Sequence, residues 1–182
     1  IKGIYQRFYD EYGSDFPIDD VIKRVHAYMA NRFETEGVPL KDGLITLLQY
    51  LKDHNYKTIV ATSSNRNRVD TILESAKLTQ YFEYELQLAF SNQYLDDSIC
   101  GDEVTKGKPN PEVFLKSCEK LSVRTDEAIV LEDSEAGIQA AHSAQIQVLC
   151  IPDMKYPEDP YAQMTTKIIQ SLNDVIDFLK DA

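Results

Sequence analysis

The sequence predicts an α/β fold, a parallel sheet with helices on both faces, preceded by a helical segment. Three observations support this prediction. Short, β-branched and almost wholly apolar runs recur from residue 57 onward, and helical periodicity separates them, which is typical of parallel strands buried on both faces. By contrast, residues 1–36 contain two helical patterns in a row with no strand between them. The length of 182 residues suits one domain, or one domain with a small attachment.

The helical segment at the front consists of two amphipathic patterns. Ile4, Phe8 and Tyr12 recur at helical spacing and predict the first helix. The stretch SDFPIDD then supplies a turn, and the same periodicity resumes from Val21 to Phe33. The pattern changes again after EGVPLKDG, so we expect residues 1–36 and residues 37–182 to be separate parts of the chain.

The elements of the second part alternate in type. Four leucines at helical spacing predict its first helix, and the apolar run in KTIVATSS predicts its first strand. The predicted helices are residues 44–51, 66–78, 110–121, 134–144 and 172–180, and the predicted strands are residues 57–64, 85–90, 127–133, 147–152 and 167–170.

Composition excludes several classes of protein. Lys and Arg number 19 against 30 Asp and Glu, and a net charge of −11 argues against binding along a nucleic-acid backbone. Neither a signal peptide nor an apolar run long enough to span a membrane is present in the sequence. We expect a soluble, cytoplasmic protein that is a monomer and contacts no membrane.

The three cysteines indicate neither disulfides nor a zinc site. Cys100, Cys118 and Cys150 are odd in number and widely spaced, and they form no CxxC motif. We therefore expect buried thiols in a reducing compartment.

Polar residues that follow the predicted strands are the candidates for function, because ligands of open parallel sheets bind beyond the carboxyl ends of the strands. Four places in the sequence qualify. They are Thr62 with Ser63 and Ser64, the surroundings of Lys108, the pair Glu132 and Asp133, and Asp153.

Lys108 lies in the stretch GDEVTKGKPNPEVF, which is rich in glycine and proline. Pro109 biases Lys108 to an extended backbone, and Pro109 with Pro111 suits entry into the following helix. A stiff loop of this kind would present the ammonium group to a phosphate. The alternative is an ordinary helix-entry turn with a solvated lysine.

Thr62 begins the stretch TSSNRNR, where hydroxyls and successive N–H groups at a strand-to-helix turn could bind an anion. Alternatively, Ser63 or Ser64 caps the next helix. Arg66 and Arg68 could reach a substrate anion or lie on the surface.

Glu132 and Asp133 place two carboxylates at the end of an apolar strand. A divalent cation would offset their repulsion, and Mg²⁺ prefers such oxygen ligands together with phosphate and water. The alternative is that Asp133 or Ser134 caps the following helix while Glu132 is solvated.

In combination, these stretches resemble the haloacid dehalogenase superfamily, in the branch of β-phosphoglucomutase and related sugar-phosphate phosphatases with a helical cap. IVATSS, GDEVTKGKPNPEVF and IVLEDSEAGIQAA are similar to the second, third and fourth motifs of that family, and the resemblance covers roughly residues 37–155. It implies a Rossmann-like core and a Mg²⁺-dependent phosphatase of a small phosphorylated metabolite such as a sugar phosphate.

The resemblance also implies a role for each candidate. Thr62 would hydrogen-bond the transferring phosphoryl group, and Lys108 would neutralise it and hold the attacking aspartate. Glu132 and Asp133 would hold Mg²⁺, with Asp133 as the direct ligand. Positions at the far end of the substrate correspond to Ser64, Asn65 and Arg66. The expected phosphate- and substrate-binding residues are thus Thr62, Ser63, Ser64, Asn65, Arg66 and Lys108.

One departure from the family pattern concerns the nucleophile. The family's first motif, an apolar strand that ends in DxDx(T/V), is not found in these residues. We interpret residues 1–36 as a remnant of a helical cap and residues 37–182 as a core that lacks its first strand, so the isolated chain is expected to be inactive. Two alternatives stay open at this point: a natural protein that binds metal and phosphate without turnover, and an enzyme whose nucleophile is Asp153.

Functions other than a phosphatase fit the sequence less well. A phosphosugar mutase remains open as an alternative. A receiver domain of two-component signalling would carry its acidic pair early in the chain, whereas Glu132 and Asp133 come late. A nucleotide-binding module is not indicated, because the seven glycines form neither GxGxxG nor a P-loop.

Overall fold

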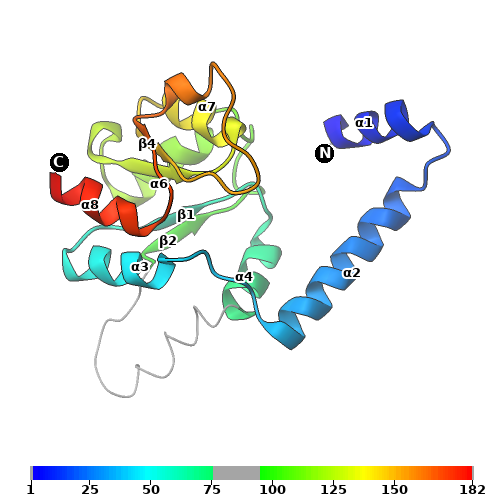
Figure 1. Ribbon diagram of the computed structural model, residues 1–182, viewed down its shortest axis with the longest axis horizontal. Coiled ribbons are helices and arrows are strands. Elements are labelled where there is room, and N and C mark those ends of the chain that lie inside the picture. The colour runs from blue at the N-terminus through cyan, green and yellow to red at the C-terminus, as the bar shows by residue number, and fades with distance from the viewer. Residues whose placement is uncertain (1, 76–94, 182) are drawn as a thin grey trace. The chain divides into compact units, whose positions relative to one another are not determined.

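A computed structural model describes residues 2–75 and 95–181 of the chain. The chain divides into two compact units, Ile1–Pro39 and Leu40–Ala182. The boundary lies at residues 39 and 40, where the sequence led us to expect 36 and 37. Figure 1 shows the course of the chain through both units.

The first unit contains the two helices expected at the front of the chain, α1 (Lys2–Tyr12) and α2 (Ile18–Glu36). Aromatic rings hold the connection between them, because Phe16 stacks on Phe8 and Tyr12 with ring centroids 5.4 and 5.0 Å apart. The interpretation of the first unit as part of a helical cap stays a prediction.

The second unit has the predicted alternation of helices and strands. All predicted elements from residue 40 onward are present except residues 85–90, which lie outside the described residues. The elements are α3 (Leu44–Asp53), β1 (Ile59–Ala61), α4 (Arg66–Ser75), β2 (Asp97–Ile99), α6 (Glu112–Leu121), β3 (Ile129–Glu132), α7 (Glu135–Ser143), β4 (Gln147–Cys150), β5 (Lys167–Ile168) and α8 (Asn173–Asp181), with single 3₁₀ turns at Thr125–Glu127 and Ala162–Met164.

Every strand pair in the described residues is parallel, which confirms the predicted α/β class. The strands form two sheets, one with the order β1-β2 and one with the order β3-β4-β5. Val60 lies opposite Ser98 in the first sheet, and Val130 lies opposite Val148 in the second.

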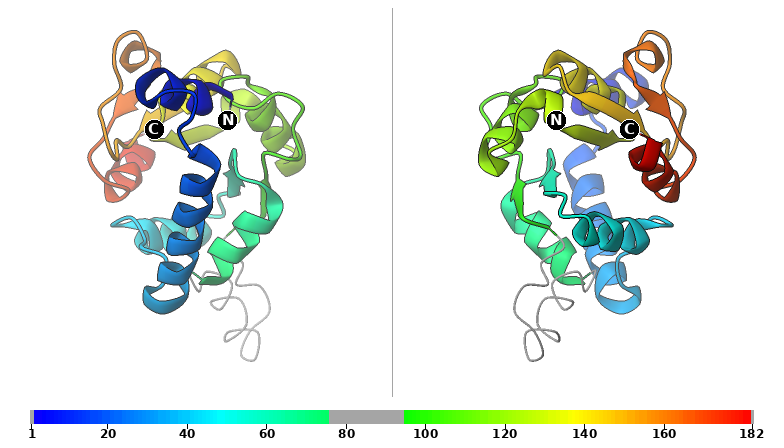
Figure 2. Two further views of the ribbon diagram at one scale, coloured as in Figure 1. Left: turned by 90° about the vertical axis from the view of Figure 1, so that its right-hand side faces the viewer. Right: turned by 90° about the vertical axis from the view of Figure 1, so that its left-hand side faces the viewer.

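Helices cover both faces of the larger sheet, with α7 on one side and α3 and α8 on the other (Figure 2), whereas α6 packs against β1 and β2. Side chains along β4 alternate between two buried clusters. Val148 and Cys150 belong to the cluster that contains residues of α6 and α7, whereas Leu149 and Ile151 belong to the cluster that contains residues of α3 and α8. Burial on both faces is the physical reason for the continuous apolar run in this strand.

Strand β2 is the element that the sequence did not predict. It has three residues and includes the polar Asp97 and Ser98. Ser98 is buried beside the Arg66 guanidinium, and Asp97 forms a 2.8 Å ion pair with Lys120 of α6. Tertiary partners therefore stabilise a strand in which Asp97 and Ser98 have little β propensity.

Within residues 2–75 and 95–181, no helix is both long enough and apolar enough to cross a membrane.

Candidate functional site

Lys108 lies at the carboxyl ends of β1 and β3. Its Nζ donates a 3.2 Å hydrogen bond to the carbonyl oxygen of Ala61 and forms an ion pair with Glu132. The ammonium group also lies 4.8 Å from the centroid of the Phe114 ring. The exposed fractions of the Lys108 and Glu132 side chains are 11% and 8%, so the solvated lysine considered as an alternative does not describe this residue.

The loop that carries Lys108 is held by its own ends. The Glu112 carboxylate accepts 2.8 Å hydrogen bonds from the backbone N–H groups of Thr105 and Lys106. The side chain of Asn110 accepts a 3.1 Å hydrogen bond from the Glu112 N–H at the start of α6. These contacts close the loop that carries Lys108.

Glu132 has a carboxylate whose acceptor sites are largely occupied by the protein. Besides the ion pair with Lys108, it accepts hydrogen bonds from the backbone N–H groups of Asp133 at 3.3 Å and Ser134 at 3.2 Å, and from the Ser134 hydroxyl at 2.9 Å. The solvated glutamate of the alternative interpretation is therefore not observed.

Asp133 differs from its neighbour because its side chain is exposed to solvent. No side chain or backbone group in residues 2–75 and 95–181 donates a hydrogen bond to this carboxylate, whereas Ser134, not Asp133, caps α7 by accepting a 3.1 Å bond from the Gly137 N–H. A carboxylate with open acceptor sites, beside one whose sites are filled, is suited to bind a cation through hard oxygen atoms.

Burial and these two carboxylates also act on a neighbouring thiol. Removal from water raises the pKa of the Cys150 thiol, and the negative charges of Asp133 and Glu132 raise it further. Cys100, Cys118 and Cys150 are all free and buried, as the sequence predicts.

Thr62 follows β1 directly and lies at the same strand end as the Ala61 carbonyl that binds Lys108. Its N–H donates to the Ile99 carbonyl at 3.0 Å, which extends the pairing of β1 with β2. Its Oγ1 accepts a 3.1 Å hydrogen bond from the Ser64 N–H and keeps its own proton for another acceptor. The structure thus brings Thr62, Lys108 and the acidic pair to one edge of the strands.

The start of α4 is capped by the protein's own groups. Asn65 accepts a 2.9 Å hydrogen bond from the Arg68 N–H, and the Asp102 carboxylate accepts bonds of 3.1 and 3.2 Å from the Arg66 N–H. Ser63 is exposed, and neither it nor Ser64 supplies this cap. An anion at this helix end would have to compete with Asp102.

Arg66 is engaged by partners on β2 and on the loop after it. Its guanidinium bonds the Ser98 hydroxyl, forms an ion pair with Glu103 and donates a 3.2 Å bond to the Ser98 carbonyl. Asp70 lies 3.9 Å away on the next turn of α4. A contact between Arg66 and a substrate stays a prediction, because the observed role of this side chain is to join α4 to β2.

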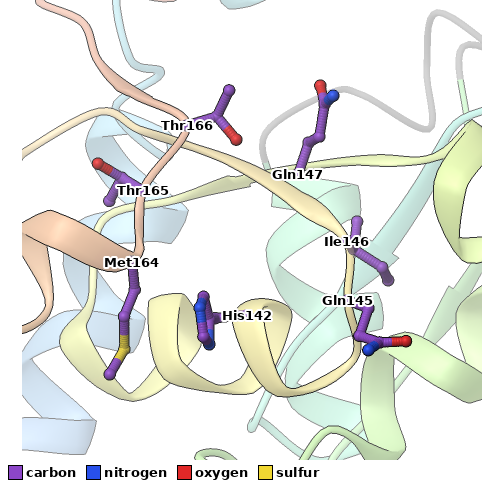
Figure 3. Close-up of a pocket in the computed structure, with 7 residues that line it drawn as sticks. All are labelled: His142, Gln145, Ile146, Gln147, Met164, Thr165 and Thr166. Atoms are coloured by element: carbon purple, nitrogen blue, oxygen red, sulfur yellow. The ribbon is translucent and has the colours of Figure 1, made fainter.

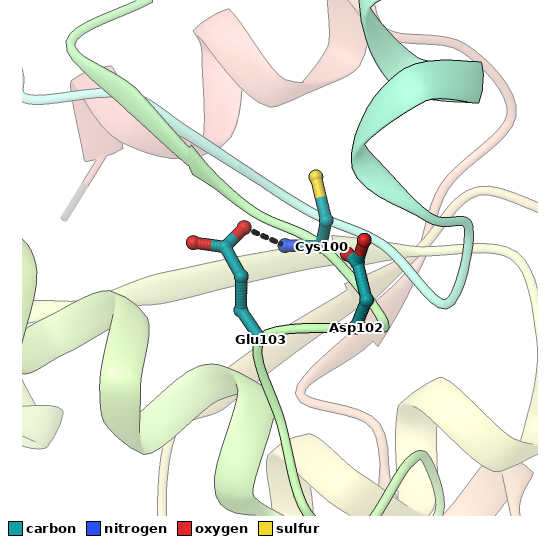
Figure 4. Close-up of side chains that lie close together, drawn as sticks. All are labelled: Cys100, Asp102 and Glu103. Carbon is teal, nitrogen blue, oxygen red and sulfur yellow. Dashed lines mark hydrogen bonds between the residues drawn. The ribbon is translucent and has the colours of Figure 1, made fainter.

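The loop after β2 brings together Cys100, Asp102 and Glu103, which Figure 4 shows, and their potential ligand atoms lie within 4.8 Å of one another. Sequence spacing did not suggest this cluster. Both carboxylates bind groups of Arg66, and Glu103 also accepts a 2.8 Å bond from the Cys100 N–H. The cluster is therefore accounted for by hydrogen bonds within the protein.

Asp153 follows β4 but lies beside Lys41. The Lys41 ammonium is 3.1 Å from the Asp153 carboxylate and donates a weaker bond of 3.4 Å to the Ile151 carbonyl. This surface pair connects the loop after β4 to the beginning of the second unit.

An open pocket of about 440 Å³ lies at the other end of β4, where Gln147 begins the strand. Figure 3 shows the side chains that line it, among them His142, Met164 and Thr166. None of the residues predicted to bind phosphate, substrate or metal lines this pocket.

Comparison with known proteins gives consistent results. Residues 1–151 match the family model described as haloacid dehalogenase-like hydrolase. A Thermotoga maritima protein named phosphorylated carbohydrates phosphatase is 31% identical over 130 residues, which cover 71% of this chain and 54% of that protein. A Streptomyces hygroscopicus protein named validoxylamine A 7'-phosphate phosphatase is 34% identical over 129 residues, which cover 71% of this chain and 54% of that protein. The chain spans about half the length of these curated relatives.

A solved structure shares the fold. The crystal structure of a Thermotoga maritima protein assigned as a beta-phosphoglucomutase superimposes with a TM-score of 0.72 at 23% identity, and the match covers 96% of this chain and 74% of that one. This likeness confirms the fold that the sequence motifs led us to expect.

Proposed function

Because the chain belongs to the haloacid dehalogenase-like hydrolase family, we propose that it forms the core of a Mg²⁺-dependent phosphatase acting on a small phosphorylated metabolite such as a sugar phosphate. The observation that carries the proposal is the position of Lys108, whose ammonium group lies between the ends of β1 and β3 beside an acidic pair. The relatives named as phosphatases of phosphorylated carbohydrates and of validoxylamine A 7'-phosphate support this substrate class.

Each residue at this edge has a proposed task in phosphoryl transfer, where positioning and charge neutralisation supply most of the catalysis. Lys108 neutralises the equatorial oxygens of the phosphoryl group, and the Thr62 hydroxyl donates a hydrogen bond to them. Asp133 is the direct ligand of Mg²⁺, which would neutralise charge on the transferring group when bound. Glu132 is adjacent to Asp133 in the sequence. Its ion pair with Lys108 indicates that it orients the ammonium group.

The exposed Asp133 carboxylate fits a hard, oxygen-binding cation, and Mg²⁺ needs only one or two protein carboxylates when phosphate oxygens and water complete its shell. The described residues therefore supply a carboxylate for Mg²⁺. The other protein ligands would come from the nucleophile motif.

The nucleophilic aspartate is proposed to come from a strand outside these 182 residues. Among the described residues, β1 pairs only with β2 and β3 pairs only with β4, so each has an edge without a partner. Leu131 of β3 is 37% exposed, which is unusual for an apolar residue in a parallel sheet. A strand between β1 and β3 would join the two sheets and would bring its terminal aspartate to Lys108. The first unit would then be part of a helical cap.

The test is hydrolysis of p-nitrophenyl phosphate by the full-length gene product with Mg²⁺ and with EDTA. We expect Mg²⁺-dependent release of phosphate, loss of activity in Asp133→Asn and a rate lower by about a thousandfold in Lys108→Ala, the scale seen when one charge-stabilising group is removed. Full activity in both variants would show that the site assignment is wrong. Conversion of a hexose phosphate to its isomer, without release of phosphate, would identify a mutase instead.

The proposal about the nucleophile has a separate test. The isolated 182-residue chain is expected to release no phosphate under the same conditions. Mg²⁺-dependent turnover by that chain would contradict the external nucleophile but would leave the phosphatase assignment intact.

A further inference from the structure

Gly137 lies in the first turn of α7, at a position where helix propensity favours alanine over glycine. A left-handed backbone does not explain this glycine, because the positive-φ glycines of the chain are Gly13, Gly37 and Gly43 among the described residues. Some other requirement must exclude a side chain at this position.

The requirement is the close approach of the Glu132 side chain. A Cβ atom at Gly137 would lie 2.0 Å from the carboxyl carbon of Glu132 and 2.1 and 2.2 Å from its two oxygens. Such distances are far below van der Waals contact, and Glu132 is too well buried to move aside without losing its partners. The Glu132 carboxylate therefore occupies the space that any side chain at position 137 would need.

Hydrogen bonds connect Gly137, Ser134 and Glu132 to Lys108. The Gly137 N–H donates to the Ser134 hydroxyl at 3.1 Å, and that hydroxyl donates to the Glu132 carboxylate at 2.9 Å. The other carboxylate oxygen pairs with the Lys108 ammonium. If Glu132 were displaced, that ammonium would keep, within the described residues, its hydrogen bond to the Ala61 carbonyl and its contact with the Phe114 ring, but no negatively charged partner.

We propose that Gly137 is a positioning residue for Lys108. Its missing side chain allows the Glu132 carboxylate to lie against the first turn of α7, and the carboxylate in turn holds the ammonium group at the ends of β1 and β3. The significance of this position for catalysis rests on the proposed phosphatase function, whereas the effect on Lys108 itself does not.

The experiment measures how fast Lys108 reacts with an amine reagent, trinitrobenzenesulfonate, by peptide mass spectrometry of the 182-residue chain. Lys106 is exposed in the same loop and serves as the internal reference. In Gly137→Ala we expect the reactivity of Lys108 relative to Lys106 to rise by about tenfold, because a side chain that loses its partner opens to solvent more often. If the ratio of Lys108 to Lys106 reactivity is the same in the folded variant and in the parent chain, the proposal is wrong.

The matched control is Gly107→Ala, next to Lys108 in sequence. A Cβ atom there would meet nothing within 4 Å, so this variant is expected to leave the reactivity ratio unchanged. A rise in Gly107→Ala equal to that in Gly137→Ala would mean that any change near the loop exposes the lysine, and the proposal would fail.

A double-variant comparison keeps the proposal testable if Gly137→Ala alone does not fold. In a Glu132→Ala background the obstruction is gone, so adding Gly137→Ala is expected to leave the urea midpoint unchanged or to raise it. A lower urea midpoint for the double variant than for Glu132→Ala would mean that Gly137 is required for a reason other than Glu132. That result would contradict the proposal. None of these readouts requires turnover, so they separate the role of Gly137 from the phosphatase assignment.

Discussion

The Glu112 carboxylate accepts a 2.8 Å hydrogen bond from the backbone N–H of Thr105, seven residues earlier in the chain. Together with the bond from the Lys106 N–H, this contact closes the loop that presents Lys108. These two N–H groups, and then the Lys116 ammonium, lower the pKa of Glu112 from 4.5 to about 2. The loop conformation is therefore coupled to the charge on this carboxylate.

A pH dependence of stability follows from this coupling. Because the pKa of Glu112 is lower in the folded state than in the unfolded state, its contribution is complete above pH 4.5 and is lost as the pH falls toward about 2. We expect Glu112→Gln to lower the free energy of unfolding at pH 7 and to have a smaller effect near pH 3, measured by urea denaturation. Glu119→Gln, an exposed glutamate on the same helix, is the control. An equal loss of unfolding free energy at pH 7 and at pH 3 would contradict the link between the charge on Glu112 and the loop conformation.

Arg66 is predicted to matter for stability. Replacing it with Gln removes the ion pair with Glu103 and the bonds to Ser98, and we expect a loss of roughly 1–2 kcal/mol, since the side chain is about a third exposed and solvent screens part of the interaction. Arg68→Gln on the same helix should change the free energy of unfolding by less than about 0.5 kcal/mol. Equal effects of the two substitutions in chemical denaturation would refute the structural role of Arg66.

Asp153 is expected to be dispensable for catalysis. Its carboxylate pairs with Lys41 on the surface, and such pairs contribute roughly 0–1 kcal/mol to stability. If the full-length gene product has the proposed phosphatase activity, Asp153→Asn should retain kcat and KM within about threefold of the parent values, because no step proposed above uses this residue. A complete loss of activity in this variant, with the fold intact, would support the alternative in which Asp153 is the nucleophile.

The thiols are predicted to be unreactive in the native protein. Burial raises the pKa of the thiol in Cys100, Cys118 and Cys150, so little thiolate forms near neutral pH. Titration with 5,5'-dithiobis(2-nitrobenzoic acid) at pH 7 should detect no fast thiol before denaturation and all three afterwards. Rapid reaction of a native thiol would indicate that its surroundings open readily.

Sequence motifs predicted which polar residues lie at the strand ends, and their chemical roles stay predictions. Thr62, Lys108 and Asp133 each follow or precede an element with a clear pattern, and the structure brings Thr62 and Lys108 to the end of β1, and Lys108 and the acidic pair to the end of β3. The grouping of these residues has a simple cause, because the carboxyl ends of parallel strands meet at one edge of a sheet. The sequence did not predict the partners of Arg66, because Ser98 and Glu103 are more than 30 residues away in the chain.

The amino-acid sequence by itself determined the α/β class, the order of most elements and the residues that form the candidate site, because periodicity and turn residues act locally. Only the tertiary structure decided that Glu132 is bound to Lys108 while Asp133 is exposed, that Asp102 caps α4, and that a side chain at Gly137 would collide with Glu132. These relationships depend on distances between groups that lie on different elements. Such distances arise from packing, and the periodicity and turn residues of the sequence do not give them.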